Sequence, residues 1–162
     1  MKKTILIIIA LTILTGCSLG NTPTSRVEDL LSRYQMLDNS IDVSYTALSN
    51  DTNLEQDIAN KYEETIKKQY RNLSYEIKEE EIDGNTAEVT VQIEVMNYKS
   101  IIDKYDRSNY EINQYHKLIT DNLEKSKEKI TYTLEIPLTL NNEKWQVDDL
   151  TEEIKNKLLG IY

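Results

Sequence analysis

Few side chains in this chain of 162 residues could take part in catalysis. The only histidine is His116, and the only cysteine is Cys17. A catalytic histidine needs a partner that orients its ring and a substrate within reach. The neighbours of His116 in the sequence, Tyr115 and Lys117, identify neither. We therefore predict a solvent-exposed histidine on a helix. The chain also lacks a Gly-x-Ser-x-Gly motif, so nothing in it indicates a serine hydrolase.

Acidic residues gather in two places that could be taken for metal sites. The first is residues 79–81 with Asp83, and it lacks the alternating acidic and amide ligands of an EF-hand loop. The second is residues 148–149 with residues 152–153, just before an apolar helical pattern, where negative charge is favoured by the helix dipole. We interpret both as structural, and we predict no metal site and no cofactor.

The cysteine lies in a segment with the pattern of an export signal. Two lysines precede an uncharged apolar run over residues 5–14, which is too short to span a membrane because a span needs about 20 apolar residues. The sequence Leu-Thr-Gly-Cys that ends at Cys17 resembles the bacterial lipobox. This resemblance implies a removable signal peptide over residues 1–16 and a diacylated Cys17. Two acyl chains give a stable anchor, whereas one gives only marginal membrane binding.

The charge of the remaining chain limits its partners. The full chain has 19 basic and 28 acidic residues, and removal of the two leader lysines leaves 17 against 28, a net charge of −11. Nucleic acid is therefore excluded as a partner, because basic residues must neutralise its phosphates. A single cysteine also excludes an internal disulfide. The expected partners are the membrane, through the acylated Cys17, and an envelope protein or small ligand of unknown identity.

The helical segments are predicted from capping boxes and apolar spacing. Sequences of the form Ser/Thr-x-x-Glu begin at Ser25, Thr52 and Ser108, and apolar residues at helical spacing follow each of them. The last of these lies in a helical insertion over residues 97–129. A short closing helix is expected before Gly160, which suits a left-handed cap.

The residues before the first capping box predict a tether, and those after it a single domain. Residues 17–24 contain Gly20 and Pro23 and show no apolar period, so we predict a lipidated tether there. The folded domain is then expected over residues 25–162, close to the membrane surface.

Between the helices, apolar and polar residues alternate in the period of β-strands. One predicted hairpin turns at Asp83-Gly84, a strong hairpin signal. A second turns at residues 141–142, and its Pro137 has no amide hydrogen, so that side of the backbone must face an edge or a bulge. We predict an α+β fold: a curved antiparallel sheet of about four strands packed on N-terminal helices, with a helical insertion and a short C-terminal helix.

Five short segments carry a resemblance to a known fold family. They are residues 22–24, 69–73, 75–77, 83–91 and 144–150. With these segments the chain resembles uncharacterised Gram-positive lipoproteins built on the cystatin-like cone, the α+β fold shared with nuclear transport factor two. The resemblance implies this fold and a location on the outer face of the cell membrane. It implies no reaction, because fold alone does not carry function.

The aromatic residues suggest where a ligand would bind. The chain has 11 tyrosines and no phenylalanine, so tyrosine must fill most of the aromatic core. Some enzymes on this cone, such as ketosteroid isomerase, place carboxyl and tyrosine groups in the cavity, but here we predict that the strand carboxylates point outward. The candidate cavity lining is Tyr34, Tyr62, Tyr70, Tyr75, Tyr132 and Trp145. We favour a filled core over an open cavity, and we expect the tyrosines of the insertion to pack against the sheet. The alternative for the insertion is that these tyrosines form a partner surface.

From the sequence we therefore expect a lipid-anchored, extracytoplasmic and non-enzymatic protein that binds a partner or ligand near the membrane. Two alternatives stay open. One is a module that binds a small molecule or peptide in the cone cavity, and the other is an enzyme that uses a tyrosine there. An ionisable side chain pointing into the cavity would favour the enzyme.

Overall fold

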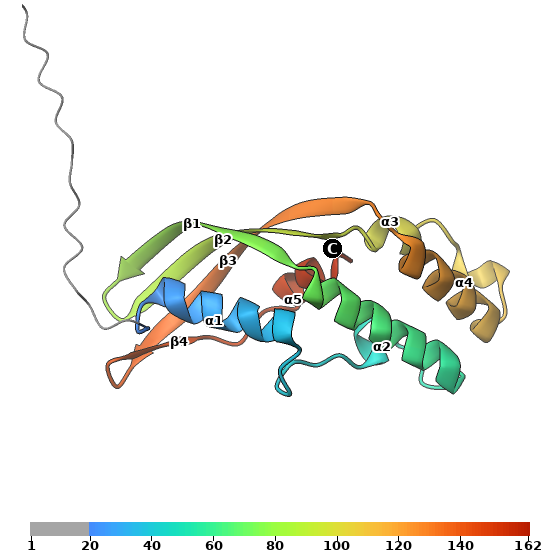
Figure 1. Ribbon diagram of the computed structural model, residues 1–162, viewed down its shortest axis with the longest axis horizontal. Coiled ribbons are helices and arrows are strands. Elements are labelled where there is room, and N and C mark those ends of the chain that lie inside the picture. Colours follow the sequence, from blue (N-terminus) through green and yellow to red (C-terminus); the bar gives the residue numbers. More distant parts are fainter. Residues whose placement is uncertain (1–19) are drawn as a thin grey trace, which may run out of the picture.

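The computed structural model describes residues 20–162 as five α-helices and one antiparallel sheet (Figure 1). The helices are α1 (Pro23–Met36), α2 (Gln56–Arg71), α3 (Lys99–Ile102), α4 (Ile112–Lys125) and α5 (Glu152–Leu159). The strands are β1 (Ser74–Asp83), β2 (Thr86–Met96), β3 (Lys129–Asn141) and β4 (Lys144–Val147). The predicted α+β class and its element order are confirmed. The predicted signal peptide and Cys17 lie outside the described residues.

The sheet has the order β1-β2-β3-β4, so each strand pairs with its neighbour in the sequence. Alternate residues of β2, from Ala87 to Val95, are buried, and those between them are not, as the period of two predicts. Asp83 pairs with Thr86 around Gly84, whose φ of 60° confirms the predicted tight turn. An irregularity in the pairing between β1 and β2, after Ile77, was not predicted.

Pro137 occupies an interior strand without interrupting a ladder. Its carbonyl accepts a hydrogen bond from the amide of Asp148 (3.0 Å), just beyond the end of β4. The N–H and C=O groups of one residue in an antiparallel strand point to the same side. The missing N–H of Pro137 therefore faces the place where β4 has ended, which confirms the expected edge.

The first helix starts earlier than predicted. Thr22 is its N-cap: the Ser25 amide donates to the Thr22 hydroxyl oxygen (3.1 Å), and the Thr22 amide donates to the Ser25 hydroxyl oxygen (3.0 Å). Pro23 takes the first helical position, where its fixed φ is favourable and its lack of an N–H costs nothing. The start predicted at Ser25 is therefore wrong, and residues 22–24 belong to the helix rather than to a tether.

The other two capping boxes do not begin helices. The first residues of α2 and α4 each come four positions after the predicted starts, Thr52 and Ser108, and neither N-cap side chain makes a capping bond. Instead, the two helix starts contact each other. The Asn113 side chain accepts from the backbone amide of Glu55 (3.4 Å) and donates to its carboxylate (3.2 Å).

The apolar residues form two core clusters rather than the single core that we expected. In the first cluster, α1, α5 and the end of α2 pack on one face of the sheet. The second lies where the start of α2 packs against α4, away from the sheet (Figure 1). Its buried members are Ile58, Tyr62, Tyr98, Tyr115, Ile119 and Leu123. The prediction that the insertion packs against the sheet is therefore wrong, because α2 extends past the sheet and buries the insertion's apolar face.

Gln69 and Gly160 join α2, β2 and α5. The Gln69 side chain is 1% exposed; its amide donates to the carbonyls of Met96 (3.0 Å) and Leu159 (2.8 Å) and accepts from the amide of Met96 (2.9 Å). Gly160 has a φ of 73°, which confirms the predicted left-handed cap. A Cβ atom there would overlap the carbonyl oxygen of Met96, so this close approach requires glycine.

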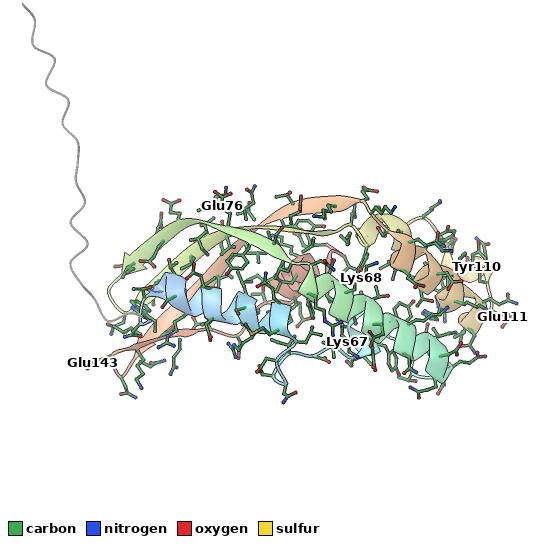
Figure 2. The ribbon with its side chains drawn as sticks, in the orientation of Figure 1. Lys67, Lys68, Glu76, Tyr110, Glu111 and Glu143 are labelled. Atoms are coloured by element: carbon green, nitrogen blue, oxygen red, sulfur yellow. The ribbon has the colours of Figure 1, made fainter. Side chains whose placement is uncertain are left out.

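The N-terminal end of the described chain is held against the hairpins. The Asn21 side chain donates to the carbonyl of Glu143 (2.7 Å) and accepts from the amide of Trp145 (3.1 Å). Glu80 on β1 accepts from the amide (2.9 Å) and hydroxyl (2.7 Å) of Thr24. Figure 2 shows Glu143 at this end of the molecule and Tyr110 at the opposite end. The chain therefore enters the fold at its hairpin end.

Candidate ligand-binding site

Of the six aromatic residues predicted to line a cavity, the structure brings two together in a pocket. Tyr34 lies in the last turns of α1 and Tyr70 in the last turn of α2. Their rings meet edge to face, with 4.9 Å between the ring centroids. Tyr34 is 9% exposed and Tyr70 is 4% exposed, so both phenols are more than nine-tenths buried. Both were predicted from the apolar faces of their helices.

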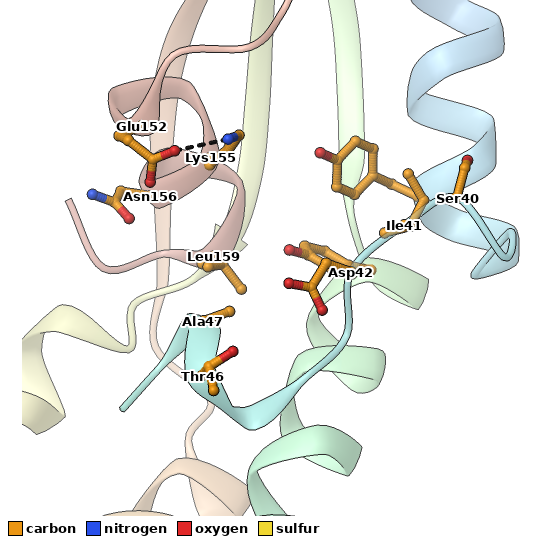
Figure 3. Close-up of a pocket in the computed structure, with 11 residues that line it drawn as sticks. Ser40, Ile41, Asp42, Thr46, Ala47, Glu152, Lys155, Asn156 and Leu159 are labelled. Atoms are coloured by element: carbon orange, nitrogen blue, oxygen red, sulfur yellow. Dashed lines mark hydrogen bonds and ion pairs between the residues drawn. The ribbon is translucent and has the colours of Figure 1, made fainter. Parts of the chain in front are cut away.

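The pocket beside these tyrosines has a volume of about 370 Å³ (Figure 3). It lies between the ends of α1 and α2, the segment that joins them, and α5. Its apolar and aromatic lining is Tyr34, Ile41, Ala47, Tyr70 and Leu159, and its polar lining is Ser40, Asp42, Thr46, Glu152, Lys155 and Asn156. The volume lies in the range of small-ligand sites, and polar residues make up about half of the lining.

The hydroxyls of Tyr34 and Tyr70 have no hydrogen-bond partner within residues 20–162. Burial raises the pKa of both phenols above the ordinary value, and the carboxylate of Asp42 raises that of Tyr70 further. Both groups therefore stay protonated at neutral pH. Both hydroxyls belong to residues that line the pocket, so they can bind polar atoms that enter it.

The charged groups of the pocket come from two elements. Asp42 follows α1, and its Oδ1 atom accepts a hydrogen bond from the amide of Ser44 (2.8 Å). On α5, the ammonium of Lys155 pairs with the carboxylate of Glu152 (2.7 Å). Figure 3 shows this pair and Asp42 on different sides of the pocket. Because Lys155 and Glu152 neutralise each other, Asp42 contributes the net charge.

The other four predicted lining residues lie elsewhere. Tyr62 is in the second core cluster, and Trp145 is in the first cluster on β4. Tyr75 is half-buried on the edge strand β1. Tyr132 is half-buried too, and its hydroxyl donates to the carbonyl of Tyr162 (2.8 Å). The six residues therefore do not share one cavity.

The prediction of a solvent-exposed His116 is wrong. The side chain is 4% exposed and lies in a chain of hydrogen bonds. Its Nδ1 atom is 2.8 Å from the Tyr62 hydroxyl, and its Nε2 atom is 2.7 Å from Oδ2 of Asp51. Arg107 donates to the same carboxylate oxygen from Nη2 (2.9 Å) and Nε (3.1 Å). No local motif indicated this network, because Asp51 lies in the connection between α1 and α2.

The Asp51 carboxylate determines one proton position in this network. A carboxylate only accepts, so Nε2 of His116 carries a hydrogen and donates it to Asp51. The hydrogen bonds from His116 and Arg107 hold the pKa of Asp51 below its usual range. The order Tyr-His-Asp is that of a catalytic relay. However, Tyr62 is 1% exposed, so a substrate cannot reach its oxygen without moving packed side chains.

The tyrosines of the insertion do not form the exposed surface considered above. Tyr98 is fully buried, Tyr115 is 8% exposed and Tyr105 is half-buried. Only Tyr110 (39%) and the neighbouring Ile112 (40%) are exposed large apolar residues of this segment. The predicted partner surface is thus reduced to two side chains at the end of the molecule.

Within the described part of the chain, no three His, Cys, Asp or Glu side chains lie close enough together to hold a metal ion. None of the helices over residues 20–162 is both long and apolar enough to cross a membrane. Comparisons with models of protein families, with curated proteins and with solved structures found no match for this chain.

Proposed function

We propose that this protein is a lipid-anchored, extracytoplasmic and non-enzymatic binding module that holds a small ligand in the Tyr34–Tyr70 pocket. The observation that carries this proposal is a pocket of about 370 Å³ with two phenol hydroxyls in its lining that have no partner among the described residues. The rings of Tyr34 and Tyr70 are held by packing, so these hydroxyls are fixed in place for a ligand. A ligand can bond to both hydroxyls, and the pocket leaves room for one.

The lipobox at Cys17 and the contacts of Asn21 support an orientation at the membrane. Three residues separate Cys17 from Asn21, and the four steps between them span at most about 3.6 Å each, or roughly 14 Å, in an extended chain. The hairpin end would therefore lie next to the bilayer. Tyr34 lies eleven residues along α1 from Pro23, which corresponds to roughly 17 Å at 1.5 Å per residue. The pocket would then be held a short distance above the lipid surface.

The anchor is tested by the variant Cys17→Ala and by labelling with a fatty acid. We expect the wild type to incorporate labelled palmitate and to sediment with membranes, and the variant to do neither. A wild type without label, together with a variant that stays in the membrane fraction, would contradict the anchor.

Ligand binding is tested by filling the pocket. Ala47 lines the pocket and is half-buried, so Ala47→Phe places a ring in the ligand space. Thr90→Phe, on the face of the sheet opposite the buried residues of β2, is the control. Small molecules that raise the melting temperature of the wild type and of Thr90→Phe should have no effect on Ala47→Phe. A panel in which every stabilising compound acts equally on all three proteins would contradict the proposal.

The enzyme alternative has less support from the geometry. The pKa values of both pocket phenols are raised, which makes them weak nucleophiles and weak acids at neutral pH. The only histidine bonds to Tyr62 and Asp51 in the second cluster and does not line this pocket. The carboxylates in the pocket lining are Asp42 and Glu152, and Glu152 is paired with Lys155.

A further inference from the structure

We infer that the ligand of the Tyr34–Tyr70 pocket is a small organic ammonium ion, a primary amine whose charge lies against the carboxylate of Asp42. This inference rests on the proposed function, because it names the chemical class of the ligand for that same pocket. It follows from the balance of charge, from the aromatic lining and from the size of the pocket.

The balance of charge favours a cation. Of the three charged side chains that line the pocket, Glu152 and Lys155 pair with each other at 2.7 Å. Asp42 has no such partner among the described residues, and its hydrogen bond to the amide of Ser44 occupies Oδ1 only. The Asp42 side chain is exposed at the edge of the pocket, and its Oδ2 atom is free to accept a charge-assisted hydrogen bond. An anion would instead be repelled by Asp42 and Glu152.

The aromatic lining suits an ammonium group as well. A cation is attracted to the face of a tyrosine ring, and a phenol oxygen accepts hydrogen bonds from an ammonium. Asp42 and Tyr70 both line the pocket. A primary ammonium has three donors in a compact group. It can therefore bond to Asp42 and Tyr70 at once, which gives the free hydroxyl of Tyr70 a partner.

The size of the pocket limits the rest of the ligand. A volume of about 370 Å³ is near the lower end of the range for small-molecule sites. It suits a molecule such as an amino-acid amide, which stands for the amino terminus of a peptide, or an amino sugar. The two share the ammonium group, and the amide of Asn156 on the α5 side can bond to the polar body of either.

The experiment is calorimetric titration of the mature lipoprotein in detergent micelles with alaninamide and with glucosamine, each beside its N-acetyl form. N-acetylation removes the charge and keeps the rest of the molecule. We expect at least one amine to bind about tenfold or more tightly than its acetylated form, because one charge-assisted hydrogen bond is worth at least about 1.4 kcal/mol. The stronger of the two amines identifies the source of the ammonium group.

Two variants locate the effect. Asp42→Asn should weaken binding of the amine about tenfold, whereas Glu88→Gln, on the open face of the sheet, should leave it unchanged. Equal binding of amine and N-acetyl form, or no effect of Asp42→Asn, would overturn the inference.

Absence of binding by all four compounds would overturn the inference too. The proposed function would still stand if a neutral or anionic compound bound to the wild type and not to Ala47→Phe. If no compound of any class did so, the proposed function would fail as well.

Discussion

The hydrogen bond between Tyr62 and His116 can be tested by removing a single oxygen atom. Tyr62→Phe keeps the ring in the second core cluster and breaks the 2.8 Å contact with Nδ1 of His116. Tyr62 is 1% exposed and His116 is 4% exposed, so water does not readily replace the lost hydroxyl. The variant therefore leaves a buried ring nitrogen without a hydrogen-bond partner.

The expected cost follows from that unpaired atom. An unsatisfied buried polar group costs about 1–3 kcal/mol, so we expect Tyr62→Phe to lower the free energy of unfolding by about 2 kcal/mol. For a protein of this size, this loss corresponds to a melting temperature lower by roughly 4–8 °C. Urea unfolding measured by circular dichroism gives the free energy directly, provided that the slope m is unchanged.

Tyr70→Phe is the matched control. Tyr70 lies on the same helix and is 4% exposed, but its hydroxyl has no partner among the described residues and faces the pocket lining. Its removal should change the free energy of unfolding by less than about 0.5 kcal/mol, or should increase it. Equal destabilisation by the two variants would refute the reasoning, as would a larger loss for Tyr70→Phe.

Three further predictions concern other contacts of the fold. Gly160→Ala should lower the free energy of unfolding in urea by about 2–4 kcal/mol, because the new Cβ atom would overlap the carbonyl of Met96 at a position with positive φ. Gly84→Ala, whose Cβ atom would meet no atom within 4 Å, should lower it by only about 1 kcal/mol. Equal losses for the two variants would contradict this prediction. Gln69→Leu removes three buried hydrogen bonds and should cost about 2–4 kcal/mol in the same assay; a cost below about 1 kcal/mol would contradict it. The pKa of Asp51 is lower in the folded protein, so its carboxylate stabilises the fold above about pH 4, and this contribution is lost as the pH falls through the folded-state pKa. In an acid titration followed by circular dichroism, Asp51→Asn should lose less stability than the wild type as the pH falls below about 4. Identical acid unfolding profiles of the variant and the wild type would contradict this prediction.

The sheet could be predicted because its determinants are local. The alternation from Ala87 to Val95 sets which side chains face the core, and Asp83-Gly84 sets the turn that fixes the pairing. The starts of α2 and α4 could not be predicted in the same way. Ser/Thr-x-x-Glu sequences precede both helices, but the helices begin after them. At the observed helix starts, Glu55 and Asn113 contact each other although they are distant in the sequence.

The candidate site was predictable only in part. Tyr34 and Tyr70 belong to apolar faces that helical spacing reveals, so their convergence could be anticipated. Asp42 lies in a connection without a regular period, and its place in the pocket depends on how α1 and α5 are arranged. The burial of His116 was missed because its partner Asp51 is 65 residues away in the sequence. Helical spacing shows that a face is apolar without showing which element covers it.

The central claim is that the pocket beside Tyr34 and Tyr70 binds a small ligand. The most direct measurement is a nuclear magnetic resonance titration of the protein with its tyrosine rings labelled with carbon-13, using a panel of small organic molecules. The account predicts that a binding compound shifts the signals of Tyr34 and Tyr70 and leaves those of the buried Tyr62 and Tyr98 in place. Unchanged signals from Tyr34 and Tyr70 across the whole panel, or equal shifts in all four tyrosines, would contradict it.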